Sequence, residues 1–166
     1  MVRRFAWLLY LMLLAAPAMA QDADVVTGPA RAIDADIIMV GTQRVILYGV
    51  DAPERSQFCT VGTKKWGCWD EARNTLTGIL STGEATCTLS GEPDPFHRRY
   101  GVCKIGDKDV GAELIRSGMA MAFVEQADDY SAVEDEARTA AVGLWQKGAK
   151  FDMPWAWRKR NPGGFR

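Results

Sequence analysis

Two pairs of carboxylates are the residues most able to do chemistry in this sequence. Asp34 and Asp36 lie in a turn between two expected strands, and Asp51 and Glu54 follow directly after the next strand. Antiparallel pairing can bring these strand ends together. Carboxylates gathered in this way repel one another unless a cation lies among them, and hard oxygen ligands favour Ca²⁺ or Mg²⁺. A metal, an arginine such as Arg44 to hold a phosphate, and a spare carboxylate are the groups needed for phosphodiester hydrolysis.

These acidic residues have a second interpretation, which the sequence leaves open. Aspartate and glutamate in turns are most often solvated residues that bond the local backbone. The single histidine, His97, lies in a proline-containing loop, and we expect it to be exposed rather than catalytic. One histidine excludes a zinc site with several histidine ligands and weakens any Ser-His-Asp mechanism. A glycine-rich phosphate-binding motif is also absent from the sequence.

A small antiparallel sheet is expected to position the carboxylates. Short apolar runs between turn residues predict strands, and apolar residues at helical spacing predict helices. We expect strands at 30–33, 37–40, 44–48, 85–89 and 100–105, helices at 69–80, 110–116 and 130–142, and a short strand or buried crossing at 119–124. This content predicts a mainly β domain of the α+β class, namely a five-stranded OB-fold barrel with three packed α-helices.

Residues 1–20 have the three parts of a secretory signal. Arg3 and Arg4 form a basic start, and the apolar stretch that follows ends in Ala18-Met19-Ala20, which predicts cleavage after Ala20. An uncleaved membrane anchor is less favoured, because the apolar stretch is shorter than the ~20 residues that a spanning helix needs. We therefore expect a secreted or periplasmic protein. Its expected parts are a leader at 21–27, a domain at 28–147 and a basic, aromatic tail at 148–166.

The charge of the chain argues against general binding of nucleic acid. The formal net charge is −1, and removal of Arg3 and Arg4 leaves 18 basic and 21 acidic residues. Contact with an anionic partner must therefore come from a local basic cluster. The tail offers one, in which aromatic residues accompany the basic ones: Trp155, Trp157, Arg158, Lys159 and Arg160. It either caps the domain or contacts such a partner, and we expect the mature protein to be a monomer without a membrane span.

Four cysteines remain after the predicted cleavage, namely Cys59, Cys68, Cys87 and Cys103. Two disulfides are the default for an exported protein, and four cysteines allow three pairings. Cys59 and Cys68 flank one loop, whereas Cys87 and Cys103 lie in two expected neighbouring strands. We therefore predict the pairs Cys59–Cys68 and Cys87–Cys103. The alternative, a four-cysteine zinc site, lacks the close C-x₂-C pairs of such sites.

The most specific motif is Leu-Tyr-Gly-Val-Asp-Ala-Pro-Glu at 47–54. It resembles the strand and the Asp-(Ala/Thr)-Pro-Glu corner of the staphylococcal nuclease (thermonuclease) family. The resemblance extends from about Gly28 to Trp145, because further segments match in the same order along the chain. They are 34–36 before this motif and 99–101, 113–120 and 134–145 after it. It implies an OB-fold barrel with three helices and a Ca²⁺-dependent nuclease that acts on nucleic acid or nucleotides.

The resemblance also implies roles for single residues. The carboxylates of Asp36 and Asp51 would bind Ca²⁺ with help from the carbonyl of Ala52, and Asp34 would lie near the ion. Glu54 would act as general base on the attacking water. In addition, charge and a stacking or hydrogen-bonding surface along the nucleotide site would come from Arg99 and Tyr100.

The chain departs from the family pattern at both catalytic arginines. Ile46 stands where the first is usual, five residues before the corner aspartate, and Val102 stands where the second is usual. Loss of one such donor typically costs ~10²–10³ in rate. Arg44 lies two residues before Ile46 and would start about 7 Å further from the corner, and Arg98 and Arg99 are further candidates to compensate.

Two functions follow from these residues. The complete carboxylate set favours an exported, Ca²⁺-dependent endonuclease or phosphodiesterase of reduced rate. The apolar residues Ile46 and Val102 favour a non-catalytic OB-fold module that binds nucleic acid, oligosaccharide or another protein.

Overall fold

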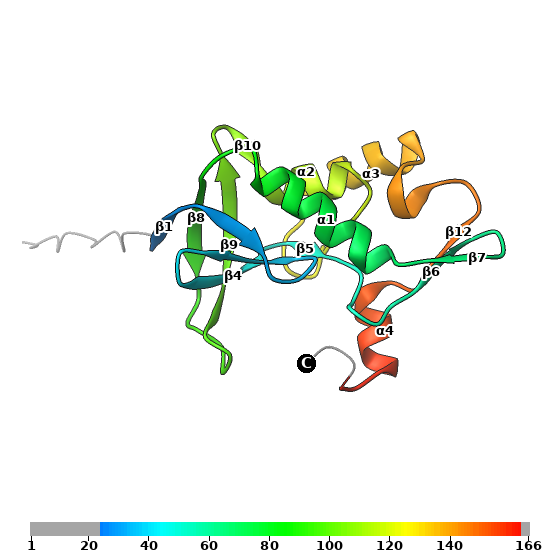
Figure 1. Cartoon of the computed structure of the whole chain (residues 1–166), viewed down its shortest axis with the longest axis horizontal. Coiled ribbons are helices and arrows are strands. Elements are labelled where there is room, and N and C mark those ends of the chain that lie inside the picture. Colours follow the sequence, from blue (N-terminus) through cyan, green and yellow to red (C-terminus); the bar gives the residue numbers. More distant parts are fainter. Residues whose placement is uncertain (1–23, 164–166) are drawn as a thin grey trace, which may run out of the picture.

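The computed structural model describes residues 24–163. The predicted signal sequence and its cleavage point lie outside the described residues. Within this range, no helix combines the length and apolar character needed to cross a membrane. In these residues the strands form one large sheet and two small ones. Three helices pack beside the large sheet, and a C-terminal helix lies apart from these three (Figure 1).

The largest sheet has seven strands and carries one pair of the acidic residues at its end. Its strands pair in the order β1-β8-β9-β4-β3-β2, and β10 pairs with β9. Neighbours are antiparallel except β4 and β9, which run parallel. The strands are β1 (Val25–Gly28), β2 (Ala30–Ala32), β3 (Ile37–Val40), β4 (Gln43–Leu47), β8 (Ala85–Ser90), β9 (Arg98–Ile105) and β10 (Lys108–Asp109).

Two smaller sheets extend the corner after β4. The strand β5 (Val50–Asp51) pairs with β11 (Met121–Ala122), so the apolar run at 119–124 contains a short strand. The strand β6 (Cys59–Val61) pairs with both β7 (Lys64–Trp66) and β12 (Ala149–Lys150). The region expected as a polar loop therefore holds the β6–β7 hairpin. The third strand of this sheet, β12, is far away in the chain, so the local sequence does not reveal its pairing with β6.

Three helices agree with the predicted segments. They are α1 (Cys68–Leu80), α2 (Val110–Arg116) and α3 (Ser131–Ala140), and the 3₁₀-helix η1 (Gly143–Trp145) follows them. The side chain of Asp109 accepts the backbone N–H of Ala112 at 2.9 Å and so caps α2.

A fourth helix, α4 (Pro154–Arg160), forms in the segment expected as a basic, aromatic tail. The sequence pattern does not predict it, because a helix of two turns shows too little apolar periodicity. Pro154 at its first turn is a helix-start signal, and three basic residues in its last turn suit the negative end of the helix dipole. The tail thus folds onto the domain, next to β6 and β12 (Figure 1).

The hydrophobic core lies between the seven-stranded sheet and the first three helices. The strand β8 buries every second residue and α1 buries residues four apart, as the two periods require. Leu76 of α1 and Leu114 and Ile115 of α2 are 0% exposed. Burial of one such side chain contributes ~1.5–3 kcal/mol. This packing holds the helices firmly against the strands that carry the acidic residues.

The α+β class and the OB-like arrangement are confirmed, and two details differ from expectation. Within residues 24–163, the strand order runs from β1 at one edge to β2 at the other, so the hydrogen-bonded ladder does not close into a barrel. Residues 25–27, expected in a leader, belong to β1, which pairs with β8. Their β-branched side chains suit a strand, but the partner strand is distant in sequence and local reasoning does not reveal it.

Both predicted disulfides are present, and the four-cysteine zinc alternative is therefore wrong. Cys59 and Cys68 join β6 to the first residue of α1, with a Cα–Cα distance of 5.7 Å. Cys87 and Cys103 lie directly opposite each other on β8 and β9, with a Cα–Cα distance of 4.0 Å. The first disulfide holds the β6–β7 hairpin to the helical layer, and the second links two neighbouring strands of the main sheet.

The end of α2 meets the start of η1 at two glycines. Gly118 (φ 74°) and Gly143 (φ 56°) both have left-handed backbone. A Cβ atom on Gly118 would lie 2.3 Å from the carbonyl oxygen of Val142. The N–H of Leu144 donates to the carbonyl of Gly118 at 2.8 Å. The two backbones can approach this closely because neither glycine has a side chain.

We predict that Gly118→Ala lowers the free energy of unfolding by about 2 kcal/mol or more, from left-handed strain together with the backbone clash. Gly78→Ala in α1 is the matched control, because a Cβ there would meet nothing within 4 Å. The control should stabilise the protein by up to ~1 kcal/mol. Urea unfolding of the oxidised protein measures both variants. A Gly118→Ala variant as stable as the parent would contradict the packing described here.

Candidate active site

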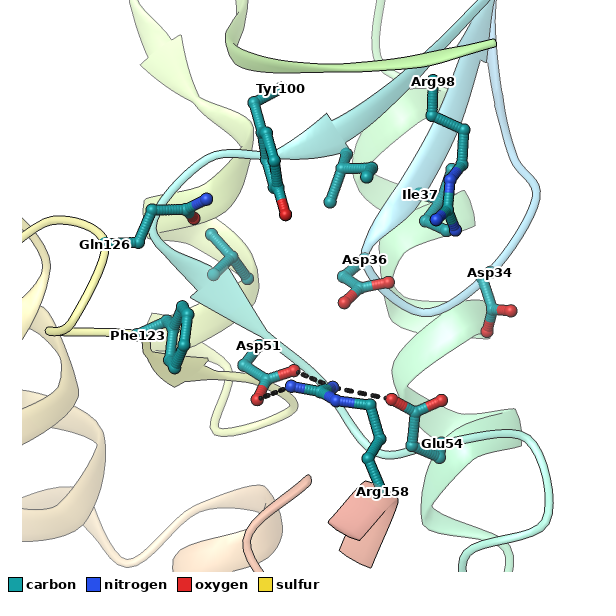
Figure 2. A pocket seen from close by; sticks show the side chains of 12 residues that line it. Asp34, Asp36, Ile37, Asp51, Glu54, Arg98, Tyr100, Phe123, Gln126 and Arg158 are labelled. Atoms are coloured by element: carbon teal, nitrogen blue, oxygen red, sulfur yellow. Dashed lines mark hydrogen bonds and ion pairs between the residues drawn. The ribbon is translucent and has the colours of Figure 1, made fainter. Parts of the chain in front are cut away.

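A cavity of about 300 Å³ lies where β3 and β9 begin and β4 ends, beside the corner that carries Asp51 and Glu54. Both acidic pairs open into it, facing two arginines and a set of apolar and polar side chains (Figure 2). The lining residues are Asp34, Asp36, Ile37, Ile46, Val50, Asp51, Glu54, Arg98, Tyr100, Phe123, Gln126 and Arg158. The expected juxtaposition of the two pairs of carboxylates is therefore present.

One face of the main sheet forms the wall of the cavity. Ile37, Ile46 and Tyr100 are neighbours in register across β3, β4 and β9. Because side chains two residues apart share a face of a strand, Val102 lies on the same face of β9 as Tyr100. Arginines at 46 and 102 would thus stand on the cavity face of the sheet, but both positions carry apolar side chains.

The turn between β2 and β3 places Asp34 and Asp36. The N–H groups of Ile33 and Asp34 donate to the carbonyl of Ile37 at 2.8 and 3.0 Å, and the N–H of Leu47 donates to the carbonyl of Asp36 at 2.9 Å. The indole N–H of Trp69, on α1, donates to the Asp34 carboxylate. Asp34 is therefore oriented from the helical layer, whereas the side chain of Asp36 projects into the cavity (Figure 2).

The turn after β4 places Asp51. Gly49, at its centre, has a φ of 73°, a left-handed value that favours glycine. The side-chain oxygen of Gln126 accepts the Gly49 N–H at 2.7 Å. Asp51 then pairs in register with Met121 of β11, and Glu134 of α3 accepts the N–H of the next residue of β11 at 2.7 Å. Hydrogen bonds from both sides fix this corner.

Glu54 is positioned by a buried glutamine. Gln57 is 2% exposed, and its side-chain oxygen accepts the N–H of Glu54 at 3.1 Å. Its amide nitrogen donates to the carbonyl of Asp152 at 2.6 Å, in the segment that leads into α4. One side chain therefore joins the acidic corner to the C-terminal segment.

The C-terminal segment supplies a cation to the two corner carboxylates. Nη1 and Nη2 of Arg158 donate to the two carboxylate oxygens of Asp51 at 2.6 and 2.9 Å. Nη1 also donates to Oε1 of Glu54 at 2.7 Å. The Arg158 side chain is 30% exposed, against 4% for Asp51 and 14% for Glu54. Figure 2 shows the guanidinium lying between the two carboxylates. Sequence reasoning missed this site residue, since only its place in a basic tail marked it.

Burial and neighbouring charges shift the pKa values of three carboxylates in the cavity. Burial, followed by the charges of Asp51, Glu54 and Asp34, holds the pKa of Asp36 well above its usual range. Burial also raises the pKa of Asp51 and of Glu54, although the hydrogen bonds from Arg158 oppose the rise. Burial alone would lower the pKa of Arg158, but its bonds to Asp51 and Glu54 outweigh this effect and raise the pKa. Four carboxylates thus share the cavity with two arginines, and one of these, Arg98, is paired with Asp94.

The other predicted residues lie in different surroundings. Ala52 is buried beside Asp51. Asp94 holds Arg98, which lines the cavity, at 2.7 Å. Arg99 bonds Asp24 at 2.6 Å outside the cavity lining. Arg44 is exposed, and its Nη1 lies 3.5 Å from the carbonyl of Phe96. Tyr100 lines the cavity and is 43% exposed. The structure brings Arg98 and Tyr100 to the cavity, but not Arg44 and Arg99, and leaves His97 exposed as expected.

The donor chemistry of the cavity fits a hard cation such as Ca²⁺, because Asp36, Asp51 and Glu54 offer carboxylate oxygens. In residues 24–163, however, no three acidic, cysteine or histidine side chains converge closely enough to enclose a metal as they stand. Arg158 holds both carboxylate oxygens of Asp51. A cation shared by Asp36 and Asp51 would repel the Arg158 guanidinium that is bound to Asp51.

Comparison with known proteins decides the family. The family model described as a staphylococcal nuclease homologue matches residues 44–147. The chain belongs to the staphylococcal nuclease family. The matched range includes Asp51, Glu54 and Tyr100 but ends before α4, so the family pattern does not include Arg158.

Individual relatives have different names. The chain is 34% identical over 143 residues to the succinoglycan biosynthesis protein ExoI of Rhizobium meliloti (strain 1021), covering 80% of this chain and 73% of that protein. It is 31% identical over 130 residues to the probable endonuclease LCL3 of Yarrowia lipolytica, covering 71% and 56%. An uncharacterized endonuclease of Haemophilus influenzae is 25% identical over 119 residues, with 70% and 61% covered. The chain thus spans less than two thirds of these two endonuclease-named relatives.

We predict that Asp36→Asn raises the melting temperature of the metal-free protein at pH 7. The raised pKa of Asp36 means that its charged form destabilises the fold above that pKa, by repulsion and burial. The gain should be about 2–4 °C for each kcal/mol of penalty removed. It should shrink as the pH falls through the pKa of Asp36, because the parent then becomes protonated.

Asp135→Asn, at an exposed position on α3, is the control for this experiment. Thermal unfolding followed by circular dichroism from pH 4 to 8, in chelator, gives both curves. An Asp36→Asn gain that is the same at every pH would contradict the proposed origin.

We predict that Gln57→Leu loosens the C-terminal segment. The change removes the bonds to Glu54 N–H and Asp152 C=O, and a buried unsatisfied group costs ~1–3 kcal/mol. Limited trypsin digestion followed by mass spectrometry should show faster cleavage within 150–160. Gln43→Leu, in β4 at the edge of the turn after β3, is the control and should digest at the parent rate.

Proposed function

We propose that this protein is a Ca²⁺-dependent endonuclease or phosphodiesterase that hydrolyses DNA or RNA. The observation that carries the proposal is the convergence of Asp36, Asp51 and Glu54 on one cavity in a staphylococcal nuclease fold. Two endonuclease-named relatives support the reaction class. Tyr100 at the cavity edge offers a stacking surface to a base, and Arg98 beside it offers positive charge to a nucleotide phosphate.

The cavity residues would have separate roles in this reaction. Asp36 and Asp51, with the carbonyl of Ala52 and with Asp34 nearby, would hold Ca²⁺. The bound ion supplies positive charge that polarises the phosphate and stabilises the transition state. Glu54 takes a proton from a water molecule as the water oxygen attacks phosphorus. The bond from phosphorus to the departing sugar oxygen breaks, and that oxygen takes up a proton. The products are a phosphate monoester and a hydroxyl.

The catalytic rate is expected to be lower than the fold allows. Ile46 and Val102 stand on the cavity face where arginines would help to neutralise the phosphate, and loss of one such donor costs ~10²–10³ in rate. Arg44 and Arg99 would have to leave their present contacts to reach the cavity. Arg98 is nearer, although Asp94 already neutralises much of its charge.

We also propose that the protein is exported, with cleavage after Ala20 and a domain that includes β1 and so begins by Val25. The two disulfides support this location, since disulfides persist in oxidising compartments. The C-terminal segment would then act as part of the catalytic domain rather than as a separate tail.

A non-catalytic binding module is the second candidate function. The apolar Ile46 in the cavity lining favours it, and so does the relative named for succinoglycan biosynthesis. In this case the cavity would hold a nucleic acid or oligosaccharide without cleaving it. Ile46→Arg with Val102→Arg separates the two candidates, because strong cleavage created in an inactive parent would identify a lapsed nuclease.

We predict that Glu54→Gln abolishes Ca²⁺-dependent cleavage of single-stranded DNA, with a loss of about 10²–10⁴-fold. Glutamine keeps the shape but cannot accept the proton. The measurement is digestion of labelled DNA by oxidised protein, with Ca²⁺ or with chelator. Glu125→Gln, exposed outside the cavity lining, is the control and should keep parent activity. If Glu54→Gln cleaves as fast as the parent, the assignment of the general base is wrong.

A further inference from the structure

We propose that Arg158, on α4, is the phosphate-binding arginine of this site. It takes the role of the two sheet arginines of the family, whose usual positions carry Ile46 and Val102 in this chain. Without metal and substrate, its guanidinium rests on Asp51 and Glu54. With Ca²⁺ and substrate bound, the guanidinium would leave Asp51 and bind the phosphate. This inference rests on the proposed function and extends it to a residue outside the matched family range.

The position of Arg158 is the first argument. Nη1 lies 2.7 Å from the Oε1 atom of Glu54. A water held by Glu54 for attack must lie next to the phosphorus atom. A guanidinium in contact with Glu54 therefore lies beside the phosphate that would be cleaved. The side chain lines the same cavity and is 30% exposed, so it can change conformation without breaking the core.

The other nearby arginines are already engaged elsewhere. Asp94 holds Arg98 through both Nε and Nη2 at 2.7 Å. Arg99 bonds Asp24 and the carbonyl of Gly91, and Arg44 points toward the carbonyl of Phe96. Among these arginines, Arg158 is the one whose charge is directed at the acidic corner of the cavity.

The chemistry of the guanidinium is the second argument. It has five N–H donors in a planar fork, and its bonds to Asp51 and Glu54 use three. A fork that fits the two oxygens of Asp51 also fits two oxygens of a phosphate. A divalent ion between Asp36 and Asp51 would repel the guanidinium from Asp51 and free this fork.

The anchoring of α4 is the third argument. Pairing of β12 with β6, the bond from Gln57 to Asp152 and the contact of Trp155 with Phe123 at 6.1 Å between ring centroids hold the segment in place. None of these contacts involves the Arg158 side chain. The helix can therefore stay docked while the arginine moves between carboxylate and phosphate.

The test compares Arg158→Gln and Arg158→Lys with Arg160→Gln. Arg160 lies on the same helix, pairs with Asp152 and is 58% exposed, so its replacement makes the same change in charge outside the cavity. Three quantities are measured for each oxidised protein: Ca²⁺ affinity by calorimetry, affinity for a short phosphorothioate single-stranded DNA in Ca²⁺, and kcat and KM for DNA cleavage. Melting temperatures establish that each variant is folded.

We expect Arg158→Gln to bind Ca²⁺ about 10-fold more tightly, because a competing cation has been removed. The same variant should bind the phosphorothioate DNA about 10- to 100-fold more weakly and lose about 10²-fold in kcat. Arg158→Lys should keep the Ca²⁺ affinity of the parent but lose part of the DNA affinity, since lysine has charge without the fork. Arg160→Gln should match the parent in all three.

DNA affinity in Arg158→Gln equal to that of Arg160→Gln would overturn the proposal. Weaker Ca²⁺ binding in folded Arg158→Gln would also overturn it, because Arg158 would then be a structural support of the metal site. If Arg158→Gln does not fold, Arg158→Lys is compared with the parent instead. DNA affinity of Arg158→Lys equal to that of the parent would then overturn the proposal. A parent that binds the DNA but never cleaves it would overturn the nuclease proposal alone, because the binding comparison still judges Arg158.

Discussion

Repulsion among buried and half-buried carboxylates is the constraint on which the site depends. Asp34, Asp36, Asp51 and Glu54 line one cavity, where water screens their charges poorly. Such an arrangement costs stability, and the raised pKa values of Asp36, Asp51 and Glu54 express that cost. A protein keeps this cluster only if the rest of the fold holds it together and cations are available to it.

The fold holds the cluster from several sides. α1 orients Asp34 through Trp69, α3 supports the strand that pairs with Asp51, and Gln57 joins Glu54 to the C-terminal segment. These contacts reach back to the core between the sheet and α1 and α2. The strain of the acidic corner is therefore offset by packing elsewhere, as is common where function requires an unfavourable local arrangement.

The source of positive charge is where this chain differs from the pattern of its family. The sheet positions 46 and 102 are apolar, and the arginine in contact with the acidic corner comes from a helix beyond the matched range. A fold constrains the sheet wall of a site more strongly than it constrains which segment covers the opening. The same carboxylate corner can therefore be served by an arginine from the sheet or from an added helix.

Local sequence determined much of this protein. Alternating and helical apolar periods located the main strands and α1 to α3, because these elements bury one face and the pattern records it. The motif at 47–54 located Asp51 and Glu54, and cysteine spacing with expected strand neighbours determined both disulfides. The resemblance of five ordered segments indicated the family.

Only the tertiary structure decided the rest. The strands β1, β6 and β12 pair with partners far away in the chain, which leaves no local period to read. The position of Arg158 between Asp51 and Glu54 also depends on distant contacts. It requires the pairing of β12 with β6 and the hydrogen bond from Gln57 to Asp152. The sequence shows a basic, aromatic tail, but whether its charge faces solvent or the carboxylates depends on contacts that exist only after the chain has folded.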